Sequence, residues 1–553
     1  MTQEHVPVLI VGAGDAGLSS SLLLLQQGIH PLLIERRSGI SIYPRARNLN
    51  FRTLEVLRGL GLEAEVRAAG TRISQVIFKE SLASSKQENI LDPTALAEHS
   101  EAISPDPFGW YCPQSRLEPI LLATIRQRGG DVRYSTELVS FTQNEQGVIA
   151  TLKEHVTGRS YVVRSDYLIA ADGAHSRIRQ TLGISSKGFG LLPEYVSFVY
   201  FRSPWKEFIA GHEADAFVIK NADVQGIFIV ASEDLGVFMI TDRPAQRESF
   251  EDFTAERWKD LIQKAIGKPD LAIEIVDIAH WQPAESVADQ FQQGRVFLVG
   301  DAAHTMPAYK GLGANTAIQS AQNLAWKLAA VLKGQAAQEL LATYQAERHP
   351  VGWFAAEQSL TGPGAAWLPK GTHEELLPEE KDLPFFYPIV GYRYRSQAIL
   401  SEDAASPSQD EIALLDRQEL TGLPGTRVPH LWLERQGQRI STLDLLDGRF
   451  VLLTGNNGAP WCEAAAVVAD DLGIALAAYR IGPDADVDLL DKSALYDVAS
   501  GWPARMGVSP DGAVLIRPDG FVAWRSSRLT ATPQATLEQV LARILGRSTA
   551  LAS

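Results

Sequence analysis

Short apolar runs bounded by turn residues recur along the chain and predict buried strands. The first run, residues 8–11, leads into a glycine-rich turn at 12–17 and then into a predicted helix that ends near Gln27. A second run, residues 31–34, ends at an acid, Glu35. Continuous apolar runs that alternate with helices are typical of parallel sheets covered on both faces. The N-terminal region is therefore predicted to be an α/β domain.

The glycines of the first turn have the spacing of a dinucleotide-binding fingerprint. Gly12 permits the tight turn, Gly14 lets the backbone approach a pyrophosphate, and Gly17 lets the helix pack closely on the strand. Glu35 follows Gly14 by 21 residues, the distance at which an acid holds a ribose hydroxyl. The alternative is a glycine-rich turn of some other α/β domain. The fingerprint alone does not separate a nicotinamide from a flavin.

Two later apolar runs also end at acids. Residues 167–171 lead into Asp172-Gly173, and residues 296–299 lead into Gly300-Asp301. An acid at the end of such a strand can accept hydrogen bonds from the sugar chain of a cofactor. The glycine-rich segment 311–315 then opens a long predicted helix, and its amides can stabilise negative charge on a reduced flavin ring.

The middle of the chain has a different pattern. Residues 195–201, 216–219, 226–230 and 236–240 are rich in β-branched and aromatic residues and predict an antiparallel sheet with one apolar face. Such a sheet can roof an apolar pocket. Its aromatic side chains are predicted to be core or pocket wall: Phe201, Phe217, Phe228 and Phe238. No catalytic acid or base is identified there.

Composition narrows the class of protein. A chain of 553 residues is too long for one core, so two to four domains are expected. The net charge of −15 argues against nucleic-acid and anionic-membrane partners. Two cysteines cannot form a disulfide framework or a zinc site, and the N-terminus has no basic region that predicts a signal peptide. A cytoplasmic protein without a metal site is expected.

Six ordered motifs resemble one known family over nearly the whole chain. They are the first glycine turn with Glu35-Arg36, the stretch 44–46 with 52–55, Gln114 with Leu117-Glu118, Asp172-Gly173, Gly300-Asp301, and 323–328. Together they resemble the group A flavoprotein monooxygenases, relatives of para-hydroxybenzoate hydroxylase and phenol hydroxylase. The resemblance implies bound FAD.

The resemblance also implies residue roles. Glu35 would bind the adenosine ribose, Arg45 and Gln114 would contact FAD, Asp301 would meet the flavin's sugar chain, and 307–315 would line the ring. The predicted cofactor-binding residues are Gly12, Gly14, Ala16, Gly17, Glu35, Arg36, Arg45, Gln114, Asp172, Gly173, Gly300, Asp301, Pro307, Gly311, Leu312, Gly313, Ala314 and Asn315.

The implied reaction is the hydroxylation of an aromatic, phenolic or polyketide-type substrate, for example in antibiotic biosynthesis. In this family, reduced flavin and dioxygen form a C4a-hydroperoxide that attacks an electron-rich ring. The chain has no second glycine fingerprint, so NADPH or NADH is expected to bind transiently. An antibiotic-inactivating or Baeyer–Villiger-type oxygenase stays open, as does a non-catalytic flavin-fold protein that binds a small ligand.

The predicted fold is α/β: a Rossmann-like FAD-binding domain, an inserted antiparallel-sheet substrate domain and a C-terminal thioredoxin-like domain. The β-α-β, hairpin and helix order near the C-terminus resembles the tail of phenol hydroxylase. Cys462 lies near a thioredoxin-like position without a second cysteine, which excludes dithiol chemistry and leaves a structural or homodimer-contact role. The predicted boundaries are 1–70, 106–185 and 281–395 for the first domain, 71–105 and 186–280 for the second, and 410–553 for the third.

Several residues have two interpretations. Where relatives often carry Pro-Pro-x-Gly-Gly, this chain has 307–311 with Tyr309 and Lys310, which would touch substrate or reductant or face water. Tyr309 is the candidate pocket residue, and no catalytic residue is assigned. His304 is expected to be a packed structural histidine. Arg52 and Glu55 are either part of the family motif or only a helix-cap pair. Arg177 and Arg179 are either part of the family motif or a solvated helix face.

Overall fold

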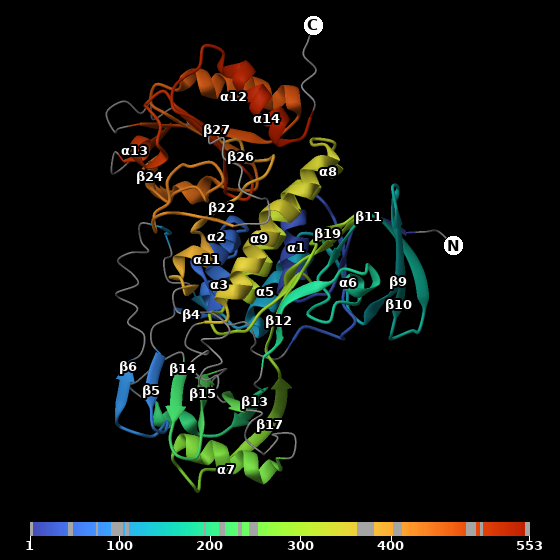
Figure 1. Ribbon diagram of the computed structural model, residues 1–553, viewed down its shortest axis with the longest axis vertical. Helices are drawn as coiled ribbons and strands as arrows, with labels where there is room; N and C mark the ends of the chain where they lie inside the picture. Colours follow the sequence, from blue (N-terminus) through green and yellow to red (C-terminus); the bar gives the residue numbers. More distant parts are fainter. Residues whose placement is uncertain are drawn as a thin grey trace.

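The computed structural model describes residues 4–41, 48–72, 76–89, 103–105, 110–192, 195–209, 216–230, 235–242, 253–361, 381–401, 412–482, 494–497 and 501–547. Three bodies follow one another along its long axis (Figure 1). A helix-covered sheet forms the centre, a second sheet with α7 (Ala255–Ile266) lies at one end, and the C-terminal unit lies at the other. No described helix is long and apolar enough to cross a bilayer.

The central sheet is the predicted α/β core. Its parallel strands pair in the order β20-β11-β1-β2-β8, and β19 adds an antiparallel edge. The strands are β1 (Glu4–Val11), β2 (Leu32–Ile34), β8 (Asp131–Arg133), β11 (Ser160–Ala170), β19 (Gln292–Gln293) and β20 (Val296–Leu298). A hairpin of β9 (Thr136–Asn144) and β10 (Gly147–Glu154) extends β11 and was not predicted. The apolar runs form the core because both faces of the sheet are covered.

Helices from distant parts of the chain cover this sheet. The helix α1 (Asp15–Gln26) follows the glycine turn, and its leucines are buried against β1 and against α8 (Gly313–Leu332). The remaining helices of this region are α2 (Phe51–Gly59), α3 (Glu63–Ala69), α5 (Gln114–Gln127), α6 (Arg177–Thr181), α9 (Ala342–Gln358) and α11 (Phe386–Ile389). Small sheets join β3 (Asn48–Leu49), β4 (Thr71–Arg72) and β7 (Trp110–Tyr111), and β12 (Ser186–Leu191), β18 (Ala284–Ala288) and β21 (His304–Thr305).

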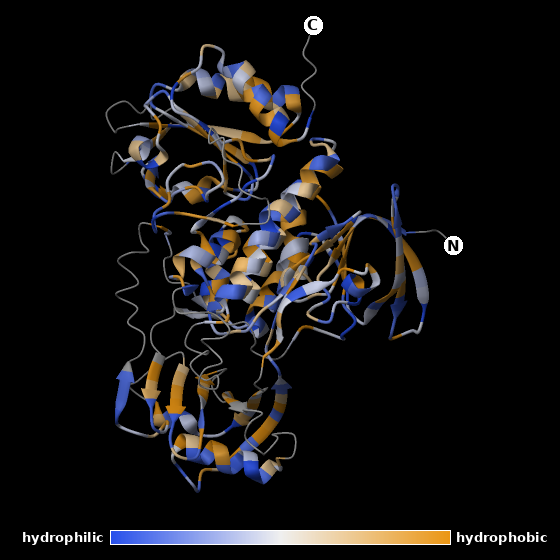
Figure 2. Cartoon of the chain, in the orientation of Figure 1, coloured by the Kyte–Doolittle hydropathy of each residue, from blue (hydrophilic) through white to orange (hydrophobic). Residues whose placement is uncertain are grey.

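The second sheet has seven strands in the order β17-β13-β16-β15-β14-β5-β6. They are β5 (Val76–Lys79), β6 (Gln87–Asn89), β13 (Tyr195–Arg202), β14 (Ala216–Lys220), β15 (Gln225–Val230), β16 (Leu235–Asp242) and β17 (Glu274–Trp281). The expected antiparallel pairing is confirmed except between β14 and β5, which run parallel. β14 and β5 are mostly hydrophobic and the edge strand β6 is hydrophilic (Figure 2). β12 pairs with β18 and stands outside this sheet.

The C-terminal unit has the strand order of a thioredoxin-like fold. β26 (Phe450–Gly455) pairs parallel to β27 (Leu476–Gly482) and antiparallel to β29 (Ala513–Ile516), which pairs with β30 (Val522–Ser526). α12 (Ala459–Leu472) connects β26 to β27, and α14 (Pro533–Ile544) follows β30 and packs beside α12 (Figure 1). The additional elements are β24 (Trp432–Arg435), β25 (Gln438–Ser441), β28 (Ala494–Asp497) and α13 (Trp502–Met506), and β22 (Tyr392–Arg393) and β23 (Ala413–Leu414) form a small ribbon.

Candidate functional site

Four strand ends assemble the site. In the sheet register, Val11 of β1 lies beside Ile34 of β2 and Ala170 of β11, and Ala170 lies beside Leu298 of β20. The segments that follow these strands therefore meet at one edge, because the carboxyl ends of parallel strands point the same way. This is how residues almost 290 positions apart come together. Neighbouring strands are only about 4.8 Å apart.

The three glycines of the first turn differ in what surrounds them. A Cβ on Gly12, which has φ +105°, would lie 2.2 Å from the Ala171 carbonyl oxygen, and one on Gly17 would lie 1.8 Å from the Gly12 carbonyl oxygen. Both positions therefore exclude a side chain. At Gly14 the nearest atom is a Glu118 carboxylate oxygen 3.9 Å away, so the space above this residue is open. That space is where the fingerprint predicts a pyrophosphate.

Glu35 closes the turn from the next strand. Its carboxylate accepts hydrogen bonds from the Ala13 amide and from the Arg37 amide, each at 2.9 Å. The neighbouring Arg36 is exposed. Ala16 links the two halves of the site, because a Cβ on Gly300 would lie 2.8 Å from its methyl group. Gly300 has φ +68°, which a glycine adopts without strain.

The Asp172-Gly173 turn is tied to the 300s by one arginine. Arg179 donates to the carbonyl oxygens of Ala302 at 2.8 Å and Ala174 at 3.0 Å, so it is a structural bridge. Asp172 accepts from the Ile178 amide through Oδ2, while its Oδ1 is enclosed without a partner. Arg177 fits the solvated-face interpretation, because its side chain is 75% exposed beside Glu137.

Asp301 is accessible at the end of β20. The residue is exposed to solvent, although Gly300 and Ala302 on either side are buried. Surrounding protein atoms partly desolvate its carboxyl group and raise its pKa to about 6. The Asp301 carboxyl is therefore available to a ligand at this edge of the sheet.

Asn315 connects the glycine-rich loop that follows Asp301 to the segment at residues 48–50. Asn315 donates through Nδ2 to the carbonyl oxygens of Asn48 and Gly311, each at 2.7 Å, and accepts from the Asn50 amide at 2.9 Å. α8 begins at Gly313, so the predicted helix start within the glycine-rich segment is confirmed. Pro307 and Leu312 are buried, and Gly311, Gly313 and Ala314 are half-buried.

Neither Tyr309 nor Lys310 simply faces water. Lys310 is buried and pairs with Asp382, and its ammonium also donates to Gln358 at 3.3 Å and to the Leu383 carbonyl at 3.2 Å. It therefore anchors the loop. Tyr309 packs against Leu192 and Leu360, and its hydroxyl is enclosed without a hydrogen-bond partner.

Three further predicted residues have simple outcomes. His304 is fully buried beside Phe291, and burial lowers its pKa to about 3, which fits a packed neutral histidine. Gln114 opens α5 and donates to Glu118 at 2.6 Å. Arg45 lies outside the described residues.

Comparisons with known proteins agree with this geometry. The model of the FAD binding domain family matches residues 5–359, and that of the aromatic-ring hydroxylase C-terminal domain matches residues 421–548. The chain belongs to the FAD-dependent aromatic hydroxylases. It is 40% identical to a putative polyketide hydroxylase of Streptomyces halstedii and 38% identical to 4-methyl-5-nitrocatechol 5-monooxygenase of a Burkholderia species, with 98% of each chain covered.

A solved structure extends the likeness to three dimensions. The hydroxylase superimposes on aklavinone-11 hydroxylase, solved as a ternary complex with FAD and aklavinone, with a TM-score of 0.86 and 34% identity. The superposition covers 99% of this chain and 100% of the other. The predicted fold class and cofactor, FAD, are thereby confirmed.

Sequence reasoning missed the side chains of this hydroxylase that face the flavin domain. The four phenylalanines singled out in the second sheet all belong to the core beneath α7. The opposite face carries Phe198, Tyr200, Ile227, Ile229, Val237 and Met239, which pack with Tyr111 of the central body. Figure 1 shows α7 on the side of this sheet that is away from the central body, so the face that packs with Tyr111 is the one nearer the flavin domain. Period-two alternation separates the two faces, but it does not say which one meets the flavin domain.

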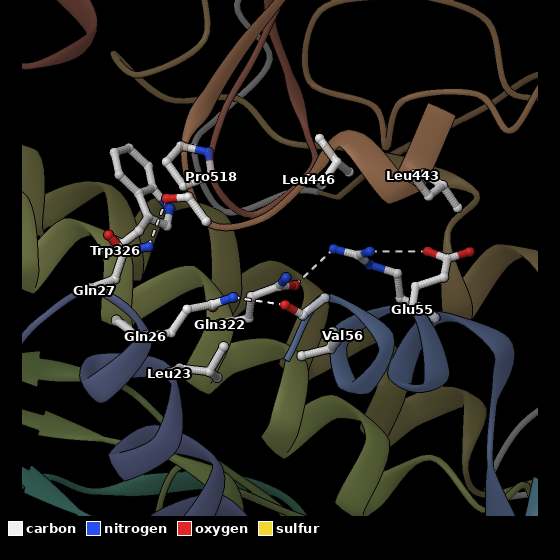
Figure 3. Close-up of a pocket in the computed structure, with 14 residues that line it drawn as sticks. Leu23, Gln26, Gln27, Glu55, Val56, Gln322, Trp326, Leu443, Leu446 and Pro518 are labelled. Atoms are coloured by element: carbon white, nitrogen blue, oxygen red, sulfur yellow. Dashed lines mark hydrogen bonds and ion pairs between the residues drawn. The ribbon is translucent and has the colours of Figure 1, made fainter. Parts of the chain in front are cut away.

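The pocket drawn in Figure 3 is not the flavin site. It lies between α1, α2, α8 and the C-terminal unit, and it has room for about 20 Å³ of water-sized space. That is enough for about one water molecule and far too little for a tricyclic ring. Arg52 lines this pocket and donates to Glu55 at 3.0 Å and to Gln322 at 2.8 Å. The pair is therefore buried at a domain interface, and Asn50 caps α2 instead.

Proposed function

We propose that the protein hydroxylates a polycyclic phenolic substrate of the polyketide type, using NADPH and dioxygen. The observation that carries this proposal is the apolar face of the second sheet, which spans β17, β13, β16 and β15. Four adjacent strands are about 14 Å wide, which suits a flat substrate of several fused rings. Relatives named as polyketide hydroxylases and tetracenomycin monooxygenases support the same class.

FAD would lie across the four strand ends. Gly14 and the α1 N-terminus would hold the pyrophosphate, Glu35 the adenosine ribose, and Asp301 the ribityl chain. The α8 amides at Gly313 would face the isoalloxazine ring. Asp172 Oδ1 and the Tyr309 hydroxyl are enclosed and have no partner, which supports a site built for a further polar molecule.

When bound, FAD supplies the activation of dioxygen and the transfer of one oxygen atom to the substrate. The chain would position the substrate and keep water away from the reacting atoms. The apolar sheet face and the loop at 307–315 would hold the substrate ring and exclude water, and the Asn315 hydrogen bonds keep this loop in place. No described side chain needs to act as a base in this proposal.

We also propose a division of labour between domains. The FAD-binding domain would comprise 1–70, 106–185 and 281–395, the substrate domain 71–105 and 186–280, and the C-terminal domain 410–553. Within the segment 186–280, β13 is the first strand that joins the seven-stranded sheet, since β12 pairs elsewhere.

The test of the substrate class is NADPH consumption by purified, FAD-loaded protein with a panel of simple phenols, quinones and polycyclic polyketides. Polycyclic phenols are expected to stimulate consumption and to yield products with one added oxygen. Deuterium exchange before mass spectrometry should reveal one extra exchangeable hydrogen, as a new hydroxyl requires. An added oxygen without that hydrogen would indicate ring expansion instead, and stimulation by simple phenols alone would contradict the polycyclic substrate.

Tyr309 is proposed to donate a hydrogen bond to a substrate oxygen. Its hydroxyl is enclosed and unpartnered on the loop that lines the ring, and an unmet hydroxyl in such a place costs about 1–3 kcal/mol. Tyr309→Phe is therefore expected to raise KM for the substrate by about tenfold without lowering stability. Steady-state kinetics together with a thermal melt provide the measurement, and unchanged kinetics would remove Tyr309 from the pocket.

A further inference from the structure

Asp15 is a buried acid with an unused oxygen in the dinucleotide turn. It is the first residue of α1, directly after Gly14, and only 7% of it is exposed. Its Oδ1 is enclosed and has no hydrogen-bond partner. Buried polar atoms are almost always paired, and the residue before Asp15, Gly14, has open space where a side chain would lie. The unpaired oxygen in this turn therefore points to a partner that arrives with a ligand.

The groups that face Asp15 disfavour its charged form. They are Glu118 of α5, Asp301 after β20 and the thiol of Cys112 after β7, none of which carries a positive charge. Burial first, and then the charges of Glu118 and Asp301, raise the pKa of Asp15 well above its usual value. The dipole of α1 acts in the opposite direction, but its effect is smaller than the cost of desolvating a carboxylate.

Glu118 differs from Asp15 in a way that identifies the free group. The Glu118 carboxylate already accepts from the Gln114 amide group at 2.6 Å and from the Ser41 backbone at 3.0 Å. Burial also raises the pKa of Glu118. Both Glu118 oxygens therefore have partners inside the protein. Of the two acids, only Asp15 has an oxygen without a partner.

We propose that Asp15 binds the cofactor as a neutral acid, donating a hydrogen bond to an oxygen of FAD. This inference rests on the proposed placement of FAD at the α1 N-terminus. An ionised carboxylate there would repel the pyrophosphate, whereas the protonated form matches an acceptor oxygen. FAD binding is then linked to the protonation of Asp15, so affinity falls as rising pH removes this proton.

The experiment measures the FAD dissociation constant of cofactor-free protein by flavin fluorescence from about pH 6 to about pH 9. The variants are Asp15→Asn, which keeps an N–H donor of the same shape, and Asp15→Ala, which removes the donor. The wild-type dissociation constant is expected to rise toward about tenfold per pH unit once Asp15 ionises. Asp15→Asn should bind FAD with nearly wild-type affinity and without that rise, and Asp15→Ala should bind about tenfold more weakly near neutral pH.

Asp301→Asn is the matched control, because it changes the neighbouring acid, whose pKa is also raised. It should keep the alkaline loss of affinity but shift it to lower pH, because the Asp301 charge no longer raises the pKa of Asp15. Tighter FAD binding by both Asp15 variants would show a repelling carboxylate and overturn the proposal, as would unchanged binding by Asp15→Ala. A loss of wild-type affinity in EDTA that Asp15→Asn does not share would show a bridging cation and also overturn it. Wild-type protein that binds no FAD would instead contradict the cofactor placement itself.

Discussion

At the scale of single residues, accessibility separates site groups from structural ones. Asp301 and His304 are three positions apart, yet Asp301 is exposed while His304 is fully buried beside Phe291. Desolvation moves their pKa values in opposite directions, up to about 6 for the acid and down to about 3 for the base. In both cases desolvation favours the uncharged form. Only the exposed group is available to a ligand.

The buried histidine predicts an acid-sensitive fold. The pKa of His304 is about 3 in the folded state and near 6.5 when unfolded, so the unfolded state binds the proton between these values. The contribution of His304 to the free energy of unfolding is therefore fully present above about pH 6.5. It falls by about 2 kcal/mol between pH 7 and pH 5. His304→Leu should lose about 2 kcal/mol less over that interval in urea unfolding. His175→Leu, which changes an exposed histidine, should show the wild-type fall in unfolding free energy over this interval. An equal fall in all three proteins would contradict the low pKa of His304.

At the scale of elements, buried charges join helices to the C-terminal unit. Glu347 of α9 binds Lys327 of α8 at 2.8 Å and Arg517 at 2.5 and 2.8 Å, and all three side chains are fully buried. Arg517 follows β29 and also pairs with Asp519. Breaking such a pair leaves an uncompensated charge in a low dielectric.

Arg517→Met is consequently expected to lower the free energy of unfolding by about 3–5 kcal/mol. Arg177→Met, which removes an exposed arginine beside Glu137, should change it by less than about 1 kcal/mol. Urea unfolding followed by tryptophan fluorescence compares the two. Similar small losses in both variants would mean that the buried network does not hold the domains together.

Elements with continuous apolar runs were predictable from the sequence, and contacts between distant elements were not. The strands that end at Glu35, Asp172 and Asp301 were found because each is a short apolar run with a turn after it. The partner of Lys310 could not be predicted, because Asp382 lies 72 residues away and no local pattern connects the two residues. Asn315 likewise reaches β3 across more than 260 residues. Only packing decides which polar group meets which.

At the scale of the whole molecule, the chain places two domains at opposite ends of one flavin body (Figure 1). The second sheet packs through one apolar face against Tyr111 of the central body, and the C-terminal unit packs on α1, α2 and α8. Trp326 of α8 belongs to the same apolar cluster as Phe450 and Trp461, so this interface is part of a core. The central claim of this arrangement is that FAD crosses the sheet at Gly14.

FAD affinity in a Gly14→Val variant tests that claim most directly. Gly14 has extended backbone, φ −83° and ψ −173°, and open space where a side chain would lie, so valine should cost the cofactor-free protein less than about 1 kcal/mol. Gly501→Val is the matched control, because a Cβ on this glycine of the C-terminal unit would meet no atom within 4 Å. Gly14→Val is expected to fold normally and to bind FAD at least about a hundredfold more weakly, while Gly501→Val should bind it like the wild type. Wild-type FAD affinity in Gly14→Val would contradict it.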